Sequence, residues 1–178
     1  MRICILGAGG CFGNNLAMYL TQFGYEVMGI GRSPRKELPY SLGGTFRYEI
    51  ADCVHDSLVF HSLLRGFQPN VVVNFAAQAG LVPQSWEYPL DFYRTNLNLP
   101  VVLASWLGKT KVRLIHIGSS EVYGSNDIAV TEDAPIKCSS PYAVSKAAAD
   151  LHLMTLKDER ITIVRPSNCY CPGQALYR

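Results

Sequence analysis

The sequence lacks the features that place a protein at a membrane or on nucleic acid. Met1-Arg2 is followed by only four apolar residues before a glycine-rich segment, which is too short for a signal peptide. No later apolar run approaches the length of a membrane span. The net charge is only +2, with no basic stripe for a nucleic acid. We therefore expect a cytoplasmic protein with neither a membrane nor a nucleic acid as partner.

Metal-binding cysteine patterns are also missing. The six cysteines, at positions 4, 11, 53, 138, 169 and 171, form no Cys-x-x-Cys pair and have no zinc spacing. Cys169 and Cys171 are two apart, but no histidine lies near them in the sequence. We expect no metal, and six free thiols of the kind usual in a cytoplasmic protein.

What the sequence does have is a regular alternation of apolar strands and amphipathic helices. The 178 residues, 48% of them hydrophobic, suffice for one core and one domain. The pattern predicts strands at residues 2–6, 26–30, 46–50, 70–75, 112–117 and 161–165. It predicts helices at residues 11–23, 56–66, 87–107 and 140–157, and a loop at 32–45. Such alternation predicts an α/β fold, a doubly wound parallel sheet with helices on both faces.

A glycine-rich turn joins the first strand to the first helix. Gly7 would permit the tight turn, Gly10 would let the backbone approach a pyrophosphate, and Gly13 would let the helix pack closely on the strand. The amino end of the following helix would face the anion. Strand, glycine turn and helix in this order predict a dinucleotide-binding site.

Three polar residues near the fifth strand and the fourth helix indicate hydride-transfer chemistry. Tyr142 and Lys146 are four apart and would share one helix face, while Ser119 follows an apolar strand. An ammonium near the phenol would lower the pKa of Tyr142 from about 10 and make it a usable base. Ser119 would bond the same substrate oxygen and hold it against the phenol.

Six segments in order carry a family resemblance. They are Gly7-Ala8-Gly9-Gly10-Cys11-Phe12-Gly13, Asn74-Phe75-Ala76-Ala77-Gln78, Thr95-Asn96, Ser119-Ser120-Glu121-Val122-Tyr123-Gly124, Tyr142 with Lys146, and Arg165-Pro166-Ser167-Asn168. Together they resemble the extended short-chain dehydrogenase/reductase family, specifically its nucleotide-sugar epimerases and dehydratases. The resemblance implies a Rossmann domain that binds NAD or NADP, a smaller carboxy-terminal domain that binds a nucleotide diphosphate sugar, and transient oxidation at the sugar C4.

The resemblance also assigns individual residues. Those implied to bind the cofactor are Gly7, Gly10, Cys11, Phe12, Gly13, Arg32, Asp52, Cys53, Phe75, Ala76, Ala77, Asn96, Tyr142, Lys146 and Pro166. Those implied to bind substrate are Gln78, Ser119 and Asn168. Asp52 would accept a hydrogen bond from the adenine amino group, and the backbone of Cys53 would lie beside it. Asparagine is mildly unfavourable inside a helix, which leans Asn96 towards a functional hydrogen bond.

The end of the second strand bears on the choice of cofactor. NAD-binding proteins usually place an acidic residue there for the ribose 2′-hydroxyl, whereas an arginine accommodates a 2′-phosphate. This sequence has Arg32 and no carboxylate at that place, with Arg35 and Lys36 close behind. The stretch from Gly24 to Arg32 is similar to NADP-using GDP-mannose dehydratases. We expect NADP to be preferred over NAD; the alternative is that Arg32 stacks on adenine or faces solvent.

Glu121 bears on the reaction type. Oxidation at C4 makes the C5 hydrogen acidic, and dehydratases of this family carry a glutamate at this position that can remove it. Ser120 would assist loss of water, as the serine of GDP-mannose dehydratases implies. The catalytic set is thus Ser119, Ser120, Glu121, Tyr142 and Lys146. A 4,6-dehydratase is the first expectation. A 4-epimerase, a UDP-glucuronate decarboxylase and an inactive cofactor-binding fragment are the alternatives, and Glu121 could also simply cap the following turn.

The chain is shorter than the family pattern implies, and it departs from that pattern at Cys171. Family members are about twice as long, with a substrate domain after the sixth strand. We expect a Rossmann domain at 1–166 and the start of a truncated substrate domain at 167–178. Cys171 replaces a glycine of the family pattern, which disfavours positive φ there and puts the substrate in doubt. The helices at 87–107 and 140–157 resemble those that pair two subunits in this family.

Overall fold

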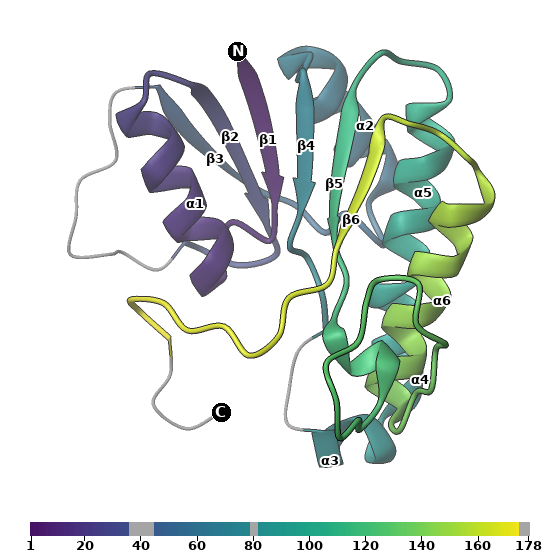
Figure 1. The fold of residues 1–178 in the computed structure, drawn as a ribbon. Coiled ribbons are helices and arrows are strands. Elements are labelled where there is room, and N and C mark those ends of the chain that lie inside the picture. The colour runs from purple at the N-terminus through teal and green to yellow at the C-terminus, as the bar shows by residue number, and fades with distance from the viewer. Residues whose placement is uncertain (36–44, 79–81, 175–178) are drawn as a thin grey trace.

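Six parallel strands form one sheet in the order β3-β2-β1-β4-β5-β6 (Figure 1). The structure, a computed structural model, describes residues 1–35, 45–78 and 82–174. The strands are β1 (Arg2–Leu6), β2 (Glu26–Gly31), β3 (Phe46–Ile50), β4 (Val71–Asn74), β5 (Arg113–Ile117) and β6 (Ile161–Val164). Each lies within one residue of its predicted bounds at both ends. Of the predicted loop at 32–45, residues 36–44 lie outside the described residues.

The predicted helix at 87–107 is wrong as a single element, because the structure divides it at Leu97. Pro100 explains the division, since it has no N–H to donate to the carbonyl of Asn96 and its ring crowds that carbonyl. The helices are α1 (Cys11–Gln22), α2 (Ser57–Phe67), α3 (Val82–Glu87), α4 (Pro89–Asn96), α5 (Asn98–Leu107) and α6 (Pro141–Thr155), with a 3₁₀ turn η1 (Ser120–Tyr123). Within the described ranges, no helix is long and apolar enough to span a bilayer.

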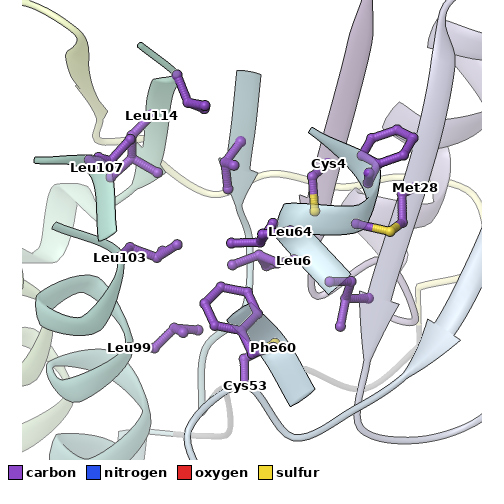
Figure 2. Packing of buried hydrophobic residues seen from close by; sticks show 14 of the residues in the cluster. Cys4, Leu6, Met28, Cys53, Phe60, Leu64, Leu99, Leu103, Leu107 and Leu114 are labelled. Carbon is purple, nitrogen blue, oxygen red and sulfur yellow. The ribbon is translucent and has the colours of Figure 1, made fainter. Parts of the chain in front are cut away.

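Strand alternation divides the core between the two faces of the sheet. Ile3 and Ile5 of β1 pack with Ala17 of α1 on one face. Cys4 and Leu6 point to the opposite face, where side chains of α2 and α5 cover them (Figure 2). The labelled core residues on that face include Phe60, Leu64, Leu99, Leu103 and Leu107. Both faces of the sheet therefore carry helices, as predicted.

The strand order reverses between β1 and β4, and this is where the predicted site residues gather. The chain runs outwards from β1 to β2 and β3 and then returns to β4 on the other side of β1. In sheets of this kind, ligands lie beyond the carboxyl ends of the strands at such a reversal. The chain after β6 runs along this same edge towards the amino end of α1 (Figure 1).

Candidate active site

The glycine turn after β1 has the close backbone packing that the sequence predicts. Gly7 has a φ of +77°, and a Cβ there would lie 2.7 Å from the Ala76 nitrogen. A Cβ on Gly13 would lie 2.6 Å from the Gly7 carbonyl oxygen and 2.9 Å from the Ala8 Cα. The tight turn at Gly7 and the close helix packing at Gly13 are confirmed. A Cβ on Gly10 would meet only the Gly7 carbonyl oxygen, at 3.2 Å.

The amino end of α1 has no capping side chain and no acidic side chain to offset the positive end of the helix dipole. Its N-cap is Gly10, which offers no side-chain hydrogen bond, and its first turn contains no acidic residue. The first amides of a helix have no partner within the helix, and they carry its positive partial charge. Cys11, Phe12 and Gly13 form this first turn. The turn can therefore receive an anion such as a pyrophosphate.

At the end of β2, the structure leaves Arg32 exposed and gives Arg35 two partners. Arg35 Nη1 donates to Asn14 Oδ1 at 3.0 Å, and its guanidinium lies 5.5 Å from the centre of the Phe46 ring. Tyr48 donates its phenolic hydrogen to the Ser33 carbonyl oxygen at 2.7 Å. Tyr48 was not predicted as a site residue. In the structure it lies against the glycine turn, because a Cβ on Gly9 would lie 2.6 Å from its hydroxyl oxygen.

The carboxylate of Asp52 is bound to its own loop. Asp52 Oδ1 accepts from the amides of Val54 and His55 at 2.9 and 3.1 Å, and Oδ2 lies 3.0 Å from His55 Nδ1. Partial burial favours the protonated acid, but the hydrogen bonds from His55 and Val54 outweigh it and lower the pKa of Asp52. Cys53 is 7% exposed, and its side chain belongs to the core. The predicted adenine contacts stay predictions.

Ser119, Tyr142 and Glu121 meet beyond the end of β5. Ser119 is close enough to Tyr142 for a hydrogen bond that lowers the pKa of the phenol, and its Oγ accepts the Glu121 amide hydrogen at 3.2 Å. Ser119, and not Glu121, therefore caps the η1 turn. Burial raises the pKa of Tyr142, the bond to Ser119 lowers it in part, and the charge of Glu121 raises it. The Glu121 carboxylate is thus close enough to the phenol to influence its ionisation.

The predicted lowering of the Tyr142 pKa by Lys146 is wrong for this structure. Lys146 is 3% exposed, and its Nζ donates to the Ile117 carbonyl oxygen of β5 at 2.5 Å. Burial lowers the pKa of Lys146 to about 8, and Asp150 opposes that shift. The lysine lies one helical turn from Tyr142 as predicted, but its ammonium is bound to the backbone of β5.

Asn96 joins the loop after β4 to α6. Its Oδ1 accepts from the Gln78 amide at 2.7 Å, and its Nδ2 donates to the Gln78 carbonyl and to Ser145 Oγ at 3.3 and 2.9 Å. The side chain is 1% exposed. Protein groups therefore use both amide hydrogens of Asn96, and these bonds hold the Gln78 backbone. The expected contact of Asn96 with the cofactor stays a prediction.

Behind Ser119 and Lys146 lies a buried polar chain that was not predicted from the sequence. Asn74 Oδ1 accepts from the Ala76 amide at 3.1 Å, so its Nδ2 faces His116 Nδ1 at 3.2 Å. This assigns the ring hydrogen of His116 to Nε2, which lies 3.7 Å from Asp150 Oδ1. Burial, together with the nearby Lys146, lowers the pKa of His116 to about 3, so the ring is neutral at pH 7.

Arg165 completes this chain at the end of β6. Its Nε donates to Asp150 Oδ2 at 2.7 Å, and its Nη1 donates to the Tyr123 hydroxyl oxygen at 2.5 Å. A Cβ on Gly118 would lie 2.9 Å from Asp150 Oδ1, which explains the glycine before Ser119. The sequence did indicate Asp150 as a partner of this chain, because it follows Lys146 by one helical turn and lies on the same, buried face of α6.

The remaining predicted residues lie at the same edge of the sheet. Phe75 packs against the core on the α1 side, and Ala76 and Ala77 follow it. The Pro166 carbonyl oxygen accepts the Ser120 amide hydrogen at 3.1 Å, which ties the end of β6 to the η1 turn. Asn168 is exposed. Within the described part of the chain, no three His, Cys, Asp or Glu side chains are placed to hold a metal.

The expectation of six free thiols is wrong for two of them. Cys11 and Cys171 form a disulfide, whereas Cys4, Cys53, Cys138 and Cys169 are free. The two partners are 160 residues apart in the sequence, so no local spacing could have indicated their pairing. Cys171 does not have a positive φ, so the backbone accommodates a side chain where the family pattern has glycine.

A parallel sheet with a glycine turn after β1 and a Ser-Tyr-Lys set beyond β5 defines a Rossmann domain of the short-chain dehydrogenase/reductase type. The family model described as the NAD dependent epimerase/dehydratase family matches residues 3–177. The chain belongs to that family.

Relatives within the family have different activities. The chain is 32% identical to the UDP-glucose 4-epimerase of Mycolicibacterium smegmatis, over 98% of this chain and 58% of that protein. It is 30% identical to a probable dTDP-glucose 4,6-dehydratase of Sinorhizobium fredii, over 84% of this chain and 47% of that protein. The chain thus spans about half the length of these curated relatives.

Solved structures agree with the fold. The UDP-glucuronic acid 4-epimerase from Bacillus cereus in complex with NAD superposes with a TM-score of 0.81 at 26% identity, over 98% of this chain and 59% of that one. The dTDP-glucose 4,6-dehydratase from Bacillus anthracis in complex with NAD gives a TM-score of 0.79 at 27% identity, over 98% and 57%. Both reactions thus occur on this fold.

Proposed function

We propose that the protein is a nucleotide-sugar 4,6-dehydratase that uses NAD or NADP for transient oxidation at the sugar C4. The observation that carries this proposal is that Ser119 accepts the Glu121 amide hydrogen, while Ser119 and the charge of Glu121 both influence the pKa of the Tyr142 phenol. Tyr142 would accept the C4 hydroxyl proton while Ser119 holds that oxygen, and the positive charge of a bound oxidised cofactor would offset the raised pKa of the phenol. Glu121 would remove the C5 proton, and Ser120 would assist departure of the C6 hydroxyl group. Lys146 would position the ribose of the cofactor.

The residues of the glycine turn suit a dinucleotide, because Gly7 and Gly13 leave no room for side chains where the turn packs and the first turn of α1 can receive an anion. When bound, the cofactor would supply the redox chemistry, as acceptor of the C4 hydride and as its donor to C6 once water has left, with a proton returned to C5. We propose residues 1–166 as the cofactor-binding domain and 167–178 as the start of a substrate-binding domain. Of the latter segment, residues 175–178 lie outside the described residues.

NADP is the proposed preference. Arg32 is exposed directly after β2, where it could meet a 2′-phosphate, and no carboxylate stands at that position. The solved relatives named above carry NAD, so NAD is the competing outcome. Calorimetric titrations with both cofactors at one salt concentration test the preference. Tighter binding of NADP, lost in R32A, supports it; equal dissociation constants contradict it.

A 4-epimerase is the second candidate, favoured by the relative that matches 98% of this chain. The E121Q variant separates the two reactions, because an epimerase has no need of a base at C5. A dehydratase should lose at least a hundredfold in kcat, which is within the usual range for removal of a general base. E132Q is the matched control, since Glu132 contributes only its backbone carbonyl oxygen to the contacts of Tyr123 and Arg165. Unchanged kcat in E121Q would favour the epimerase.

We further propose a homodimer through the helices at 87–107, which are α4 and α5 in the structure, and at 140–157, which is α6. Leu90, Val144 and Leu151 are 61%, 44% and 49% exposed on these helices. Such exposed apolar side chains on neighbouring helices are typical of a subunit interface. Sedimentation of the wild-type chain should give the dimer mass, and L151E should shift it to the monomer. A wild-type monomer at micromolar concentration would contradict this interface.

A further inference from the structure

Two cysteines with no role in the proposed chemistry meet at the amino end of α1. Cys11 is the first residue of that helix, and Cys171 lies in the segment after β6. Their Cα atoms are 6.7 Å apart, which is within the range of about 4.4–6.8 Å usual for disulfides. The bond therefore joins the glycine turn to the segment that runs along the carboxyl edge of the sheet.

A tight turn presents Cys171 to its partner. The Gln174 amide donates to the Cys171 carbonyl oxygen at 3.2 Å, and Gly173 has a φ of +83°. Proline at the second position and glycine with positive φ at the third are typical of a type II turn. Asn15 Nδ2 donates to the Pro172 carbonyl oxygen at 2.9 Å, which holds this turn against α1 independently of the sulfur atoms.

The turn lies beside the first turn of α1, where an anion would bind. The carbonyl oxygens of Cys171 and Pro172 lie 3.7 and 3.4 Å from Cys11 Sγ, beside the first turn of α1. These oxygens carry partial negative charge at the positive end of the helix dipole. A pyrophosphate that approached the first amides of α1 would come close to these oxygens, which would repel it. When the disulfide holds Cys171 in place, the oxygens cannot move away.

We propose that Cys11 and Cys171 form a reversible disulfide that closes the pyrophosphate end of the dinucleotide site when oxidised and opens it when reduced. The effect on cofactor binding rests on the proposed function. The position of Cys11 favours this chemistry, because helix amino ends stabilise thiolates and the thiolate is the reactive form. Burial raises the pKa of Cys4 and of Cys53, the latter to about 12, which leaves those two thiols unreactive.

The oxidation needs a disulfide as the electron acceptor, and oxidised glutathione represents this class. The Cys11 thiolate attacks one glutathione sulfur, which forms a mixed disulfide and releases one glutathione thiolate. The Cys171 thiolate then attacks the Cys11 sulfur and releases the second glutathione. The two protein thiols lose two protons and two electrons, and one oxidised glutathione becomes two reduced molecules. A dithiol reductant reverses both steps.

Mass spectrometry and hydrogen exchange test the disulfide without any cofactor. The full gene product is incubated with oxidised or reduced glutathione, alkylated and digested. We expect a Cys11–Cys171 cross-linked peptide only after oxidation, together with slower amide exchange at residues 7–15. C171S should abolish both changes. C169S is the matched control, because Cys169 is exposed, free and two residues away, and it should behave as wild type.

Calorimetry with NAD then tests closure of the site. We expect the dissociation constant of the oxidised protein to be at least tenfold weaker than that of the reduced protein, and we expect C171S to bind equally under both conditions. Two free thiols after oxidation, unchanged exchange at residues 7–15, or equal affinity of both forms would each overturn the proposal. If neither form bound NAD or NADP, the proposed function would fail, whereas the peptide and exchange results would still decide on the disulfide.

Discussion

Replacement of Asp150 by alanine should lower the free energy of unfolding more than almost any substitution at the surface. Asp150 is fully buried, its Oδ2 accepts from Arg165 Nε at 2.7 Å, and the Arg165 side chain is only 11% exposed. Loss of the carboxylate leaves a nearly buried guanidinium without its counter-ion. Breaking a buried pair in this way costs about 3–5 kcal/mol. For a domain of this size, that corresponds to a fall in Tm of about 6–20 °C.

Urea denaturation followed by circular dichroism measures this loss. E49A is the matched control, because Glu49 pairs with Arg47 at 3.9 Å on the surface, where such a pair contributes about 0–1 kcal/mol. D150N keeps the shape of the side chain and removes its charge, so its stability should lie between those of D150A and wild type. A cost of less than about 1 kcal/mol for D150A would refute the view that this pair is a buried support of the site.

A double-mutant cycle tests the same packing from the other side. In G118A the new Cβ would lie 2.9 and 3.0 Å from the two Asp150 carboxylate oxygens, so one group must shift. Such overpacking costs about 1–3 kcal/mol in the wild-type background. In D150A the oxygens are gone, and G118A should cost at least about 0.5 kcal/mol less. Additive effects would show that Gly118 and Asp150 do not constrain each other.

Two further predictions concern the cofactor turn and the buried lysine. G13A forces backbone atoms apart and should lower the free energy of unfolding, measured with urea, by about 1–3 kcal/mol. In the control G66A, the new Cβ meets no atom within 4 Å and should stabilise α2. Equal effects of the two variants would contradict the close packing at Gly13. Because the folded pKa of Lys146 is about 8 and its ordinary value is 10.5, the unfolded chain binds more protons between these values. The free energy of unfolding should therefore rise by roughly 3 kcal/mol from pH 8 to pH 10.5 in wild type, through Lys146. K146M should lack this rise. If K146M and wild type showed the same dependence on pH, the burial of the Lys146 ammonium would be contradicted.

The strands and the glycine turn could be predicted because local patterns determine them. Six apolar runs gave the strands to within one residue, and glycine spacing gave the turn with its positive φ at Gly7. The helix break at Leu97 could also have been predicted, since Pro100 lies four residues after Asn96. The helical spacing of apolar residues continues across Leu97, which is why a single helix was predicted.

The parts that sequence reasoning missed depend on long-range contacts. His116 and Asp150 look like ordinary strand and helix residues until the fold brings them within 3.7 Å of each other. The pKa of Tyr142 depends on how deeply the phenol is buried, and Lys146 alone could not indicate that. The pairing of Cys11 with Cys171 likewise depends on the path of the chain after β6.

The most direct test of the proposed reaction is mass spectrometry of the sugar product formed in heavy water by the full gene product. NADP or NAD is supplied together with UDP-, GDP- and dTDP-hexoses. A 4,6-dehydratase should release a product that has lost one water molecule and has gained one solvent deuterium at C5, where Glu121 removes the proton. A product of unchanged mass, with inverted C4 and no deuterium, would contradict the role of Glu121 and make the protein an epimerase.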